Sequence, residues 1–327
     1  MGDPAHFSVR GGANPHTRNM LGIRKRVDAE LAKKQWHAMA QTLLRFGNEV
    51  IVIPPNPNLT GLVYPANAGF LYPLEADSLT VSERVFYLAN LLPTRAGERE
   101  IYERFIQLLG FRTAGLTCRQ EGEADFFPAG RYMIFTYGRL ERQRFVPRAG
   151  WPPWKRIYGF RSEERALGEL SKTVRDRPIV SVELCLEAHY HGDTVLCSFG
   201  HNRESLLVYR SGISPKSFER LHSLFADHMI ELSQHDAELY AANSFQSNSD
   251  GQLQLFMPEG ISDALARAVR DRGVEPVLVK VSEFLAKGGG SIKCMILDLG
   301  PSEQMPKYES AKQFQKARSY QSVFKSQ

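Results

Sequence analysis

The chain has 327 residues, of which 43% are hydrophobic and 24% are charged, so it can bury the core of an ordinary globular protein. It contains no apolar run of the roughly 18 residues that a spanning helix needs, and its N-terminus lacks the basic and apolar regions of a secretory signal. The four cysteines have no CxxC spacing, which favours reduced thiols and a cytoplasmic location.

Five amphipathic helices are predicted, and each is followed by a β-type apolar run. The helices span 27–46, 99–109, 162–176, 214–227 and 262–272, and the apolar runs span 50–53, 110–116, 179–186, 229–232 and 276–281. The units are about 60 residues apart, which leaves room for further strands, and repetition favours a closed or stacked α/β architecture. A doubly wound sheet is the competing interpretation, but no glycine-rich dinucleotide fingerprint follows any of the strands.

A triple-glycine turn, 288–290, precedes Cys294 and an apolar run, 295–299, that we expect to form a strand. Glycine lets the backbone approach a ligand closely, and a cysteine at the mouth of a strand can act as a nucleophile. A partner histidine is available at His191, in a polar turn between the runs 182–186 and 195–199. Taken alone, an isolated cysteine and a distant histidine are more often structural than catalytic.

An acidic cluster at Glu121, Glu123 and Asp125 surrounds Gly122. Carboxylates accept the planar donor pairs of a guanidinium, so carboxylates beside a cysteine nucleophile suit a cationic guanidino substrate. The alternative is a solvated acidic turn.

Several motifs together resemble the guanidino-group-modifying superfamily. They are Gln35-Trp36, Tyr64-Pro65-Ala66-Asn67-Ala68-Gly69, Arg95-Ala96-Gly97-Glu98, Glu121 to Asp125, Tyr158-Gly159-Phe160-Arg161-Ser162, Tyr190-His191-Gly192-Asp193-Thr194 and the glycine-rich cysteine segment. The likeness is greatest to the arginine dihydrolase branch, with arginine deiminases, dimethylarginine hydrolases and amidinotransferases as relatives. It implies a five-bladed α/β propeller of pseudo-fivefold ββαβ units, in agreement with the five units above.

The resemblance also implies roles for individual residues. Cys294 corresponds to the nucleophile and His191 to the general acid/base, while Asp125 and Asp193 correspond to carboxylates that hold the guanidinium or orient the histidine. The further substrate-binding positions are Asn14, Asn67, Arg95, Glu121 and Arg161. Neither a cofactor nor a metal is implied. The positive charges of His191 and Lys293 are expected to favour the thiolate of Cys294.

Three departures from the family pattern affect the substrate. Thr60-Gly61 stands where the family has Pro-Asp, so one candidate carboxylate is missing, and Gly192 replaces a leucine. Residues 137–157 form an apparent insertion rich in arginine, with Trp151 and Trp154 beside two prolines. The insertion is interpreted as a substrate lid or a surface loop, with a partner surface or a nucleic-acid contact as further alternatives.

The leading functional hypothesis is a hydrolase of arginine or a related guanidino compound that works through a covalent adduct on Cys294. An amidinotransferase would use the same adduct but pass it to an amine acceptor, and a non-catalytic propeller that binds a guanidino ligand or a partner is the second alternative. We expect one catalytic domain at 1–300 and a basic tail at 301–327. No nucleic-acid or membrane partner is expected, and assembly into a homo-oligomer is left open.

Overall fold

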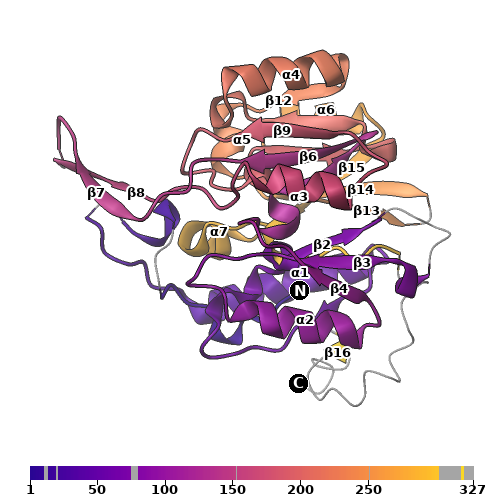
Figure 1. Cartoon of the computed structure of the whole chain (residues 1–327), viewed down its shortest axis with the longest axis horizontal. Helices are drawn as coiled ribbons and strands as arrows, with labels where there is room; N and C mark the ends of the chain where they lie inside the picture. Colours follow the sequence, from indigo (N-terminus) through magenta and orange to yellow (C-terminus); the bar gives the residue numbers. More distant parts are fainter. Residues whose placement is uncertain are drawn as a thin grey trace.

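Four three-stranded sheets of the computed structural model share one topology (Figure 1). The structure describes residues 1–10, 14–19, 21–74, 80–151, 153–249, 251–301 and 318–319. In each sheet two antiparallel strands form a hairpin, and a third strand lies parallel to the second after a helical connection. The sequence therefore folds as repeated ββαβ units of a mixed α/β protein.

The four units follow one another along the chain. Their strands are β2 (Gly69–Tyr72), β3 (Val85–Leu88) and β4 (Arg112–Gly115); β5 (Phe126–Ala129), β6 (Tyr132–Tyr137) and β9 (Ile179–Glu183); β10 (Leu196–Phe199), β11 (Ser205–Val208) and β12 (Met229–Glu231); and β13 (Phe245–Ser249), β14 (Gln252–Pro258) and β15 (Val274–Val279). Their connecting helices are α2 (Glu98–Leu108), α3 (Ala166–Thr173), α4 (Pro215–Phe225) and α6 (Asp263–Arg270), and α5 (Gln234–Glu238) and α7 (Ser282–Gly288) are shorter. The helices and apolar strands predicted from periodicity agree with these bounds to within a few residues.

The remaining predicted unit is built from both ends of the chain. Helix α1 (Ala29–Arg45) precedes β1 (Ile51–Val52), and Gly2 forms a parallel bridge with the neighbouring Ile53. Strand β16 (Arg318–Ser319) pairs antiparallel with β1, so part of the basic tail lies along this strand. The rest of the predicted tail, 302–317 and 320–327, is outside the described residues.

Helix α1 illustrates how the sequence sets the packing. The carboxylate of Asp28 caps its first turn by accepting from the backbone N–H of Leu31 at 3.0 Å. Trp36, Met39 and Leu43 recur at helical spacing and are buried in one core cluster. Burial of each such side chain contributes about 1.5–3 kcal/mol, so this face fixes the helix against the sheets.

The segment after the triple glycine differs from its prediction. Cys294 lies in a short 3-10 helix, η11 (Lys293–Met295), and 295–299 does not form the expected strand. The backbone N–H groups of Lys293 and Cys294 donate to the carbonyl and side-chain oxygens of Asn243, so they cannot join a strand ladder. Ile296 and Leu297 are nevertheless buried, which explains the apolar pattern.

The predicted insertion forms a separate two-stranded arm. Strands β7 (Arg144–Pro147) and β8 (Trp154–Ile157) pair antiparallel and project from the body of the molecule (Figure 1). Phe145, Trp151 and Trp154 are 60%, 83% and 48% exposed, so the arm has no buried core of its own.

Within the described ranges, no helix is both long enough and apolar enough to cross a membrane. No group of three or more His, Cys, Asp or Glu side chains in these ranges has the arrangement needed to hold a metal ion.

Candidate active site

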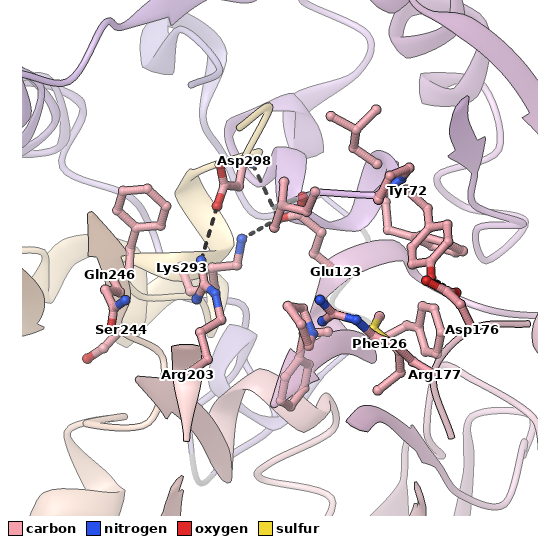
Figure 2. A pocket seen from close by; sticks show the side chains of 18 residues that line it. Tyr72, Glu123, Phe126, Asp176, Arg177, Arg203, Ser244, Gln246, Lys293 and Asp298 are labelled. Carbon is pink, nitrogen blue, oxygen red and sulfur yellow. Dashed lines mark hydrogen bonds and ion pairs between the residues drawn. The ribbon is translucent and has the colours of Figure 1, made fainter. Parts of the chain in front are cut away.

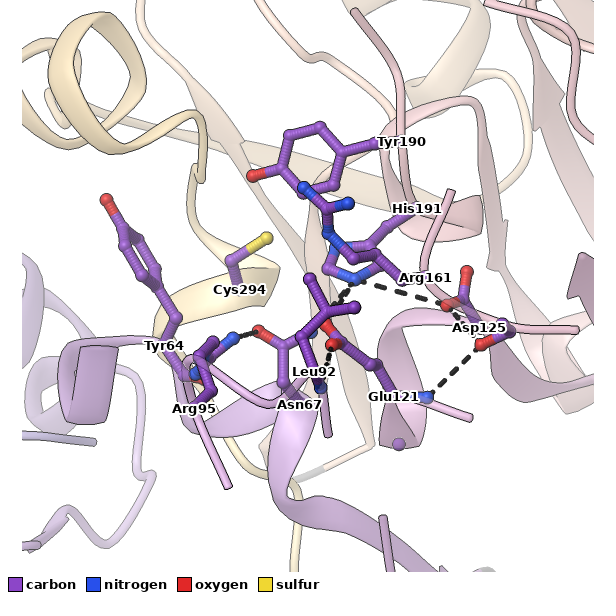
Figure 3. Close-up of polar contacts among 12 residues, drawn as sticks. Tyr64, Asn67, Leu92, Arg95, Glu121, Asp125, Arg161, Tyr190, His191 and Cys294 are labelled. Carbon is purple, nitrogen blue, oxygen red and sulfur yellow. Dashed lines mark hydrogen bonds and ion pairs between the residues drawn. The ribbon is translucent and has the colours of Figure 1, made fainter. Parts of the chain in front are cut away.

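Short 3-10 helices at the start of the sheets bring the predicted site residues together. Asn67 lies in η4 (Pro65–Ala68), Asp125 directly follows η6 (Gly122–Ala124), and Asp193 lies in η7 (Gly192–Thr194). Helix η4 contacts both η6 and η11, and η6 contacts η7. The repeated fold thus places residues far apart in the sequence around one centre (Figure 3).

Two of the glycines are required by close packing. A Cβ atom on Gly288 would lie 1.9 Å from the hydroxyl oxygen of Tyr64, so no side chain fits there. A Cβ atom on Gly192 would lie 2.2 Å from Oγ1 of Thr136, which donates to the carboxylate of Asp125 at 2.7 Å. The glycine at 192, a departure from the family pattern, therefore leaves room for a hydroxyl that supports Asp125.

The thiol of Cys294 is buried between two polar side chains. Its Sγ accepts from Nδ2 of Asn243 at 3.2 Å and donates to Oδ2 of Asp193 at 3.5 Å. Burial, followed by the negative charge of Asp193, raises the pKa of Cys294 well above its usual range. The expectation that positive charge favours the thiolate is therefore wrong, because burial and Asp193 outweigh it and Lys293 forms an ion pair with Glu123.

Sequence reasoning missed Asn243, which holds the nucleophile in place. Its Oδ1 accepts from the backbone N–H groups of Ser291 and Cys294 at 3.0 and 3.1 Å. A signal was present, because Ala242-Asn243 precedes β13 as Ala66-Asn67 precedes β2. Comparing the repeats with one another would have identified it.

His191 is oriented by a carboxylate. Its Nε2 lies 2.9 Å from Oε2 of Glu121, 3.4 Å from Nδ2 of Asn67 and 4.0 Å from Oδ2 of Asp125. Although burial raises the pKa of Glu121, the hydrogen bond and charge of His191 and the nearby arginines together lower it to about 2. In the described part of the chain Nδ1 of His191 has no hydrogen-bond partner, so this ring nitrogen is not committed to a neighbouring group.

The two aspartates have different surroundings. The carboxylate of Asp125 accepts from Thr136 at 2.7 Å, Ser162 at 2.6 Å and the backbone N–H of Gly192 at 2.9 Å. Oδ1 of Asp193 is buried without a partner among the described residues, and burial raises the pKa of this group to about 6. Asp193 therefore offers an open acceptor, whereas the oxygens of Asp125 are already engaged.

Arg95 is anchored beside the position where the family carboxylate is missing. It donates to Glu98 at 2.7 Å, to Oδ1 of Asn67 at 2.8 Å and to the carbonyl of Gly61 at 3.1 Å. A Cβ atom on Gly61 would lie 2.3 Å from Oε1 of Glu98. The carboxylate of Glu98 thus occupies the space next to position 61. The sequence alone indicated that a carboxylate was missing at this position.

Two other predicted residues lie near the glycine turn. The guanidinium of Arg161 stacks over the ring of Tyr190 at 4.7 Å. Nδ2 of Asn14 donates to the carbonyl of Gly288 at 2.8 Å and to the hydroxyl of Tyr190 at 3.2 Å. Tyr190 therefore links the N-terminal segment to the side of the site where Arg161 lies.

Most of the predicted residues border one cavity of about 200 Å³. Those that line it are Asn14, Asn67, Arg95, Glu121, Arg161, His191 and Cys294. Asp193 contacts the thiol and Asp125 lies near His191, but neither of them lines the cavity. The arrangement combines a thiol, a histidine with a free nitrogen, and carboxylates that can meet a cation.

A search of protein-family models found no match. Among curated proteins, the N(G),N(G)-dimethylarginine dimethylaminohydrolase of Mycobacterium tuberculosis is 32% identical over 301 residues, which cover 92% of this chain and 85% of that protein.

Solved structures share the fold. The N-terminal domain of an arginine dihydrolase from the ornithine–ammonia cycle in cyanobacteria, bound to its substrate, matches with a TM-score of 0.73 and 23% identity, over 92% of this chain and 97% of that one. A dimethylarginine dimethylaminohydrolase carrying an adduct with S-methyl-L-thiocitrulline matches with a TM-score of 0.64 and 18% identity, over 90% and 96%. With the extent of the sequence match, these findings show that the chain belongs to the dimethylarginine dimethylaminohydrolase family of guanidino-group-modifying enzymes.

Proposed function

We propose that this chain hydrolyses the guanidino group of arginine or of an N-methylated arginine, with Cys294 as the covalent nucleophile. The observation that carries the proposal is the buried thiol 3.5 Å from Asp193, beside a cavity that His191 also lines. Both substrates fit the chemistry named for the relatives, one a dimethylarginine dimethylaminohydrolase and the other an arginine dihydrolase.

The open oxygen of Asp193 supports a guanidinium site next to this cavity, because Asp193 contacts the thiol of Cys294, which lines it. A buried carboxylate oxygen without a partner is costly, and a guanidinium N–H can satisfy it while neutralising the charge. Arg161 lines the same cavity and can receive the carboxylate at the far end of an amino-acid substrate, while Asn14, whose amide donates to Gly288 and Tyr190, holds that side of the lining in place. Asn67, which lies beside His191 and accepts from Arg95, is placed to contact the substrate head.

Binding of the substrate also provides a means of activating the thiol. Burial and the negative charge of Asp193 raise the pKa of Cys294, which favours the thiol over the thiolate. A guanidinium held against Asp193 brings a positive charge next to Sγ, and this charge lowers the pKa of the thiol. The nucleophile thus forms where a cationic substrate is bound.

The chemistry then follows in two halves. The thiol of Cys294 gives up its proton, which passes to His191 directly or through water, and the thiolate attacks the central guanidinium carbon. The amine then leaves with that proton from His191, which gives an amidino-thioether. Neutral His191 next takes a proton from water as the oxygen attacks the same carbon. Collapse breaks the carbon–sulfur bond, and the departing thiolate takes the proton of the new hydroxyl group, which restores the thiol and releases a ureido product. In this scheme Glu121 and Asp125 position His191.

An amine acceptor is not part of the proposal, since the relatives described above are hydrolases. We also propose that 1–300 forms one catalytic domain and that its units close into the five-bladed α/β propeller. The four ββαβ sheets, together with the strand pairing of Gly2 near β1, support this architecture.

Mass spectrometry after rapid mixing with arginine or asymmetric dimethylarginine tests the proposal. We expect an amidino adduct on the peptide that contains Cys294, followed by release of a ureido product with ammonia or dimethylamine. Cys185→Ser, which alters an exposed cysteine, is the matched control and should retain both signals. An adduct on another residue, or turnover only after an amine is added, would contradict the proposal.

A further inference from the structure

A second cavity of about 280 Å³ lies behind the nucleophile. The first strands of three sheets, β2, β5 and β13, contribute side chains to it, and Lys293 and Asp298 complete its polar end (Figure 2). None of the residues to which the proposed function assigns a role lines this cavity. It is therefore separate from the cavity of about 200 Å³ that His191 and Cys294 line, which is called the substrate cavity below.

The two cavities share a wall made of η6 and η11. In η11, Cys294 lines the substrate cavity and the adjacent Lys293 lines the second one. Near η6, Glu121 lines the substrate cavity and Glu123 lines the second one. Neighbouring residues of the same short turns thus face different spaces.

Glu123, which lines the second cavity, has one carboxylate oxygen without a partner among the described residues. One carboxylate oxygen, Oε2, accepts from Lys293 and from the backbone N–H of Asp298 at 3.3 Å. Oε1 is buried and has no hydrogen-bond partner among the described residues, and Glu123 as a whole is only 5% exposed. Such an oxygen calls for a donor from a bound molecule.

The charges of the lining limit the overall charge of that molecule. Three acidic and three basic side chains line the cavity: Glu123, Asp176 and Asp298, and Arg177, Arg203 and Lys293. Because these charges balance, a ligand with a large net charge would leave an unpaired charge in a partly enclosed space. A zwitterion supplies a donor for Glu123 and an acceptor for the arginines without disturbing the balance.

The other wall of the cavity is apolar. Its aromatic residues Tyr72, Phe127 and Phe245 are only partly buried, and the ring centroid of Phe245 lies 5.8 Å from the ammonium of Lys293. Arg203 lies at the polar end, where it pairs with Asp298 at 3.6 Å. The cavity therefore has polar groups of both signs at one end and aromatic surface for a hydrophobic side chain.

We propose that this second cavity binds a small zwitterionic amino acid with an apolar side chain. Its ammonium donates to Oε1 of Glu123, its carboxylate lies near Arg203, and its side chain packs on the aromatic wall. This site goes beyond the proposed hydrolysis and does not depend on it.

Isothermal titration of the full chain with L-leucine tests the site. Two probes of matched shape dissect the recognition: 3-methylbutylamine lacks the carboxylate, and 4-methylpentanoate lacks the ammonium. We expect leucine to bind about tenfold or more tightly than either probe, since each one forfeits a charge-assisted contact. Equal affinity for all three, or no binding of leucine at millimolar concentration, would overturn the proposal.

Variants locate the binding. Glu123→Gln removes the carboxylate. Phe245→Trp fills the cavity and keeps the ion pair between Glu123 and Lys293. The second variant therefore still tests the site if Glu123→Gln fails to fold. Both should weaken leucine binding by about tenfold or more. Arg161→Ala, in the substrate cavity, is the control and should bind leucine as the unaltered chain does. Loss of binding in Arg161→Ala with retention in Phe245→Trp would place leucine in the substrate cavity and refute the second site.

Discussion

The two sides of the wall formed by η6 and η11 differ in the polar groups that lie beside them. On one side, Oδ1 of Asp193 and Nδ1 of His191 lack partners among the described residues, and burial raises the pKa of the Cys294 thiol. On the other side, Lys293 is paired with Glu123, and only Oε1 of Glu123 is left without a described partner. A thiol beside a histidine suits chemistry on a bound substrate, whereas an ion pair with one open oxygen suits recognition of a ligand. Adjacency in sequence therefore does not imply a shared site.

Removing the nucleophile should have the largest effect. Cys294→Ser is expected to abolish turnover, because a hydroxyl with an ordinary pKa cannot replace the thiol, while the similar size keeps the fold. Steady-state rates with arginine and dimethylarginine, with Cys185→Ser as control, provide the measurement. Activity of Cys294→Ser within tenfold of the unaltered chain would remove Cys294 from the mechanism.

His191→Ala should lower kcat by about 10²-fold or more if its free nitrogen transfers protons in both halves of the reaction. His189→Asn is a matched control, because His189 is also buried but its Nδ1 contacts the carbonyl of Thr194 instead of the cavity. We expect the control to lose less than about tenfold. A similar loss in both variants, with equal loss of thermal stability, would point to a structural role for His191.

The difference between the two aspartates makes a prediction that depends on pH. The pKa of Asp193 is raised to about 6, so its carboxylate is charged at neutral pH and becomes protonated as the pH falls through 6. We therefore expect kcat/KM for cationic guanidines to fall below pH 6, and Asp193→Asn to remove this part of the profile and raise KM. Asp125→Asn should affect kcat more than KM, because Asp125 is saturated by protein donors beside His191. If Asp125→Asn instead raised KM and Asp193→Asn lowered kcat, Asp125 would be the residue that binds the guanidinium and Asp193 the one that positions His191.

On the paired side of the wall, Lys293→Met should change turnover by less than about tenfold. The ammonium faces Glu123 and the second cavity, so its removal leaves the contacts of Sγ with Asn243 and Asp193 in place. Alkylation of Cys294 by iodoacetamide, followed by peptide mass spectrometry across pH, gives an independent readout. A large rise in the pH at which Cys294 reacts would show that Lys293 does stabilise the thiolate.

The helices and the repeated units could be predicted from the sequence, because apolar periodicity reflects which face of an element is buried. The residues that line the substrate cavity could be predicted from the motifs that resemble the family. The sequence did not reveal that Glu98 fills the space beside Gly61, or that Asn243 holds Cys294, since these contacts join distant segments. It also suggested the wrong charge state for the thiol. Lys293 is adjacent to Cys294 in the sequence, but its side chain points to Glu123 and forms an ion pair there. Neither the direction of that side chain nor the burial of the thiol can be read from neighbouring residues in the sequence.

The projecting arm is expected to show the smallest effect on chemistry. No described residue of 137–157 lines the substrate cavity, so the interpretation of this insertion as a lid finds no support in the position of the arm. Replacing 142–155 by a short Gly-Ser turn should leave both kcat and KM within about twofold, since exposed residues far from the reacting groups contribute little to transition-state binding. The same replacement should improve solubility, because it removes the exposed Phe145, Trp151 and Trp154. Steady-state kinetics and sedimentation of the trimmed and full chains measure both effects. A rise of KM by tenfold with an unchanged single-turnover rate would mean that the arm closes over the substrate after binding, and it would restore the lid.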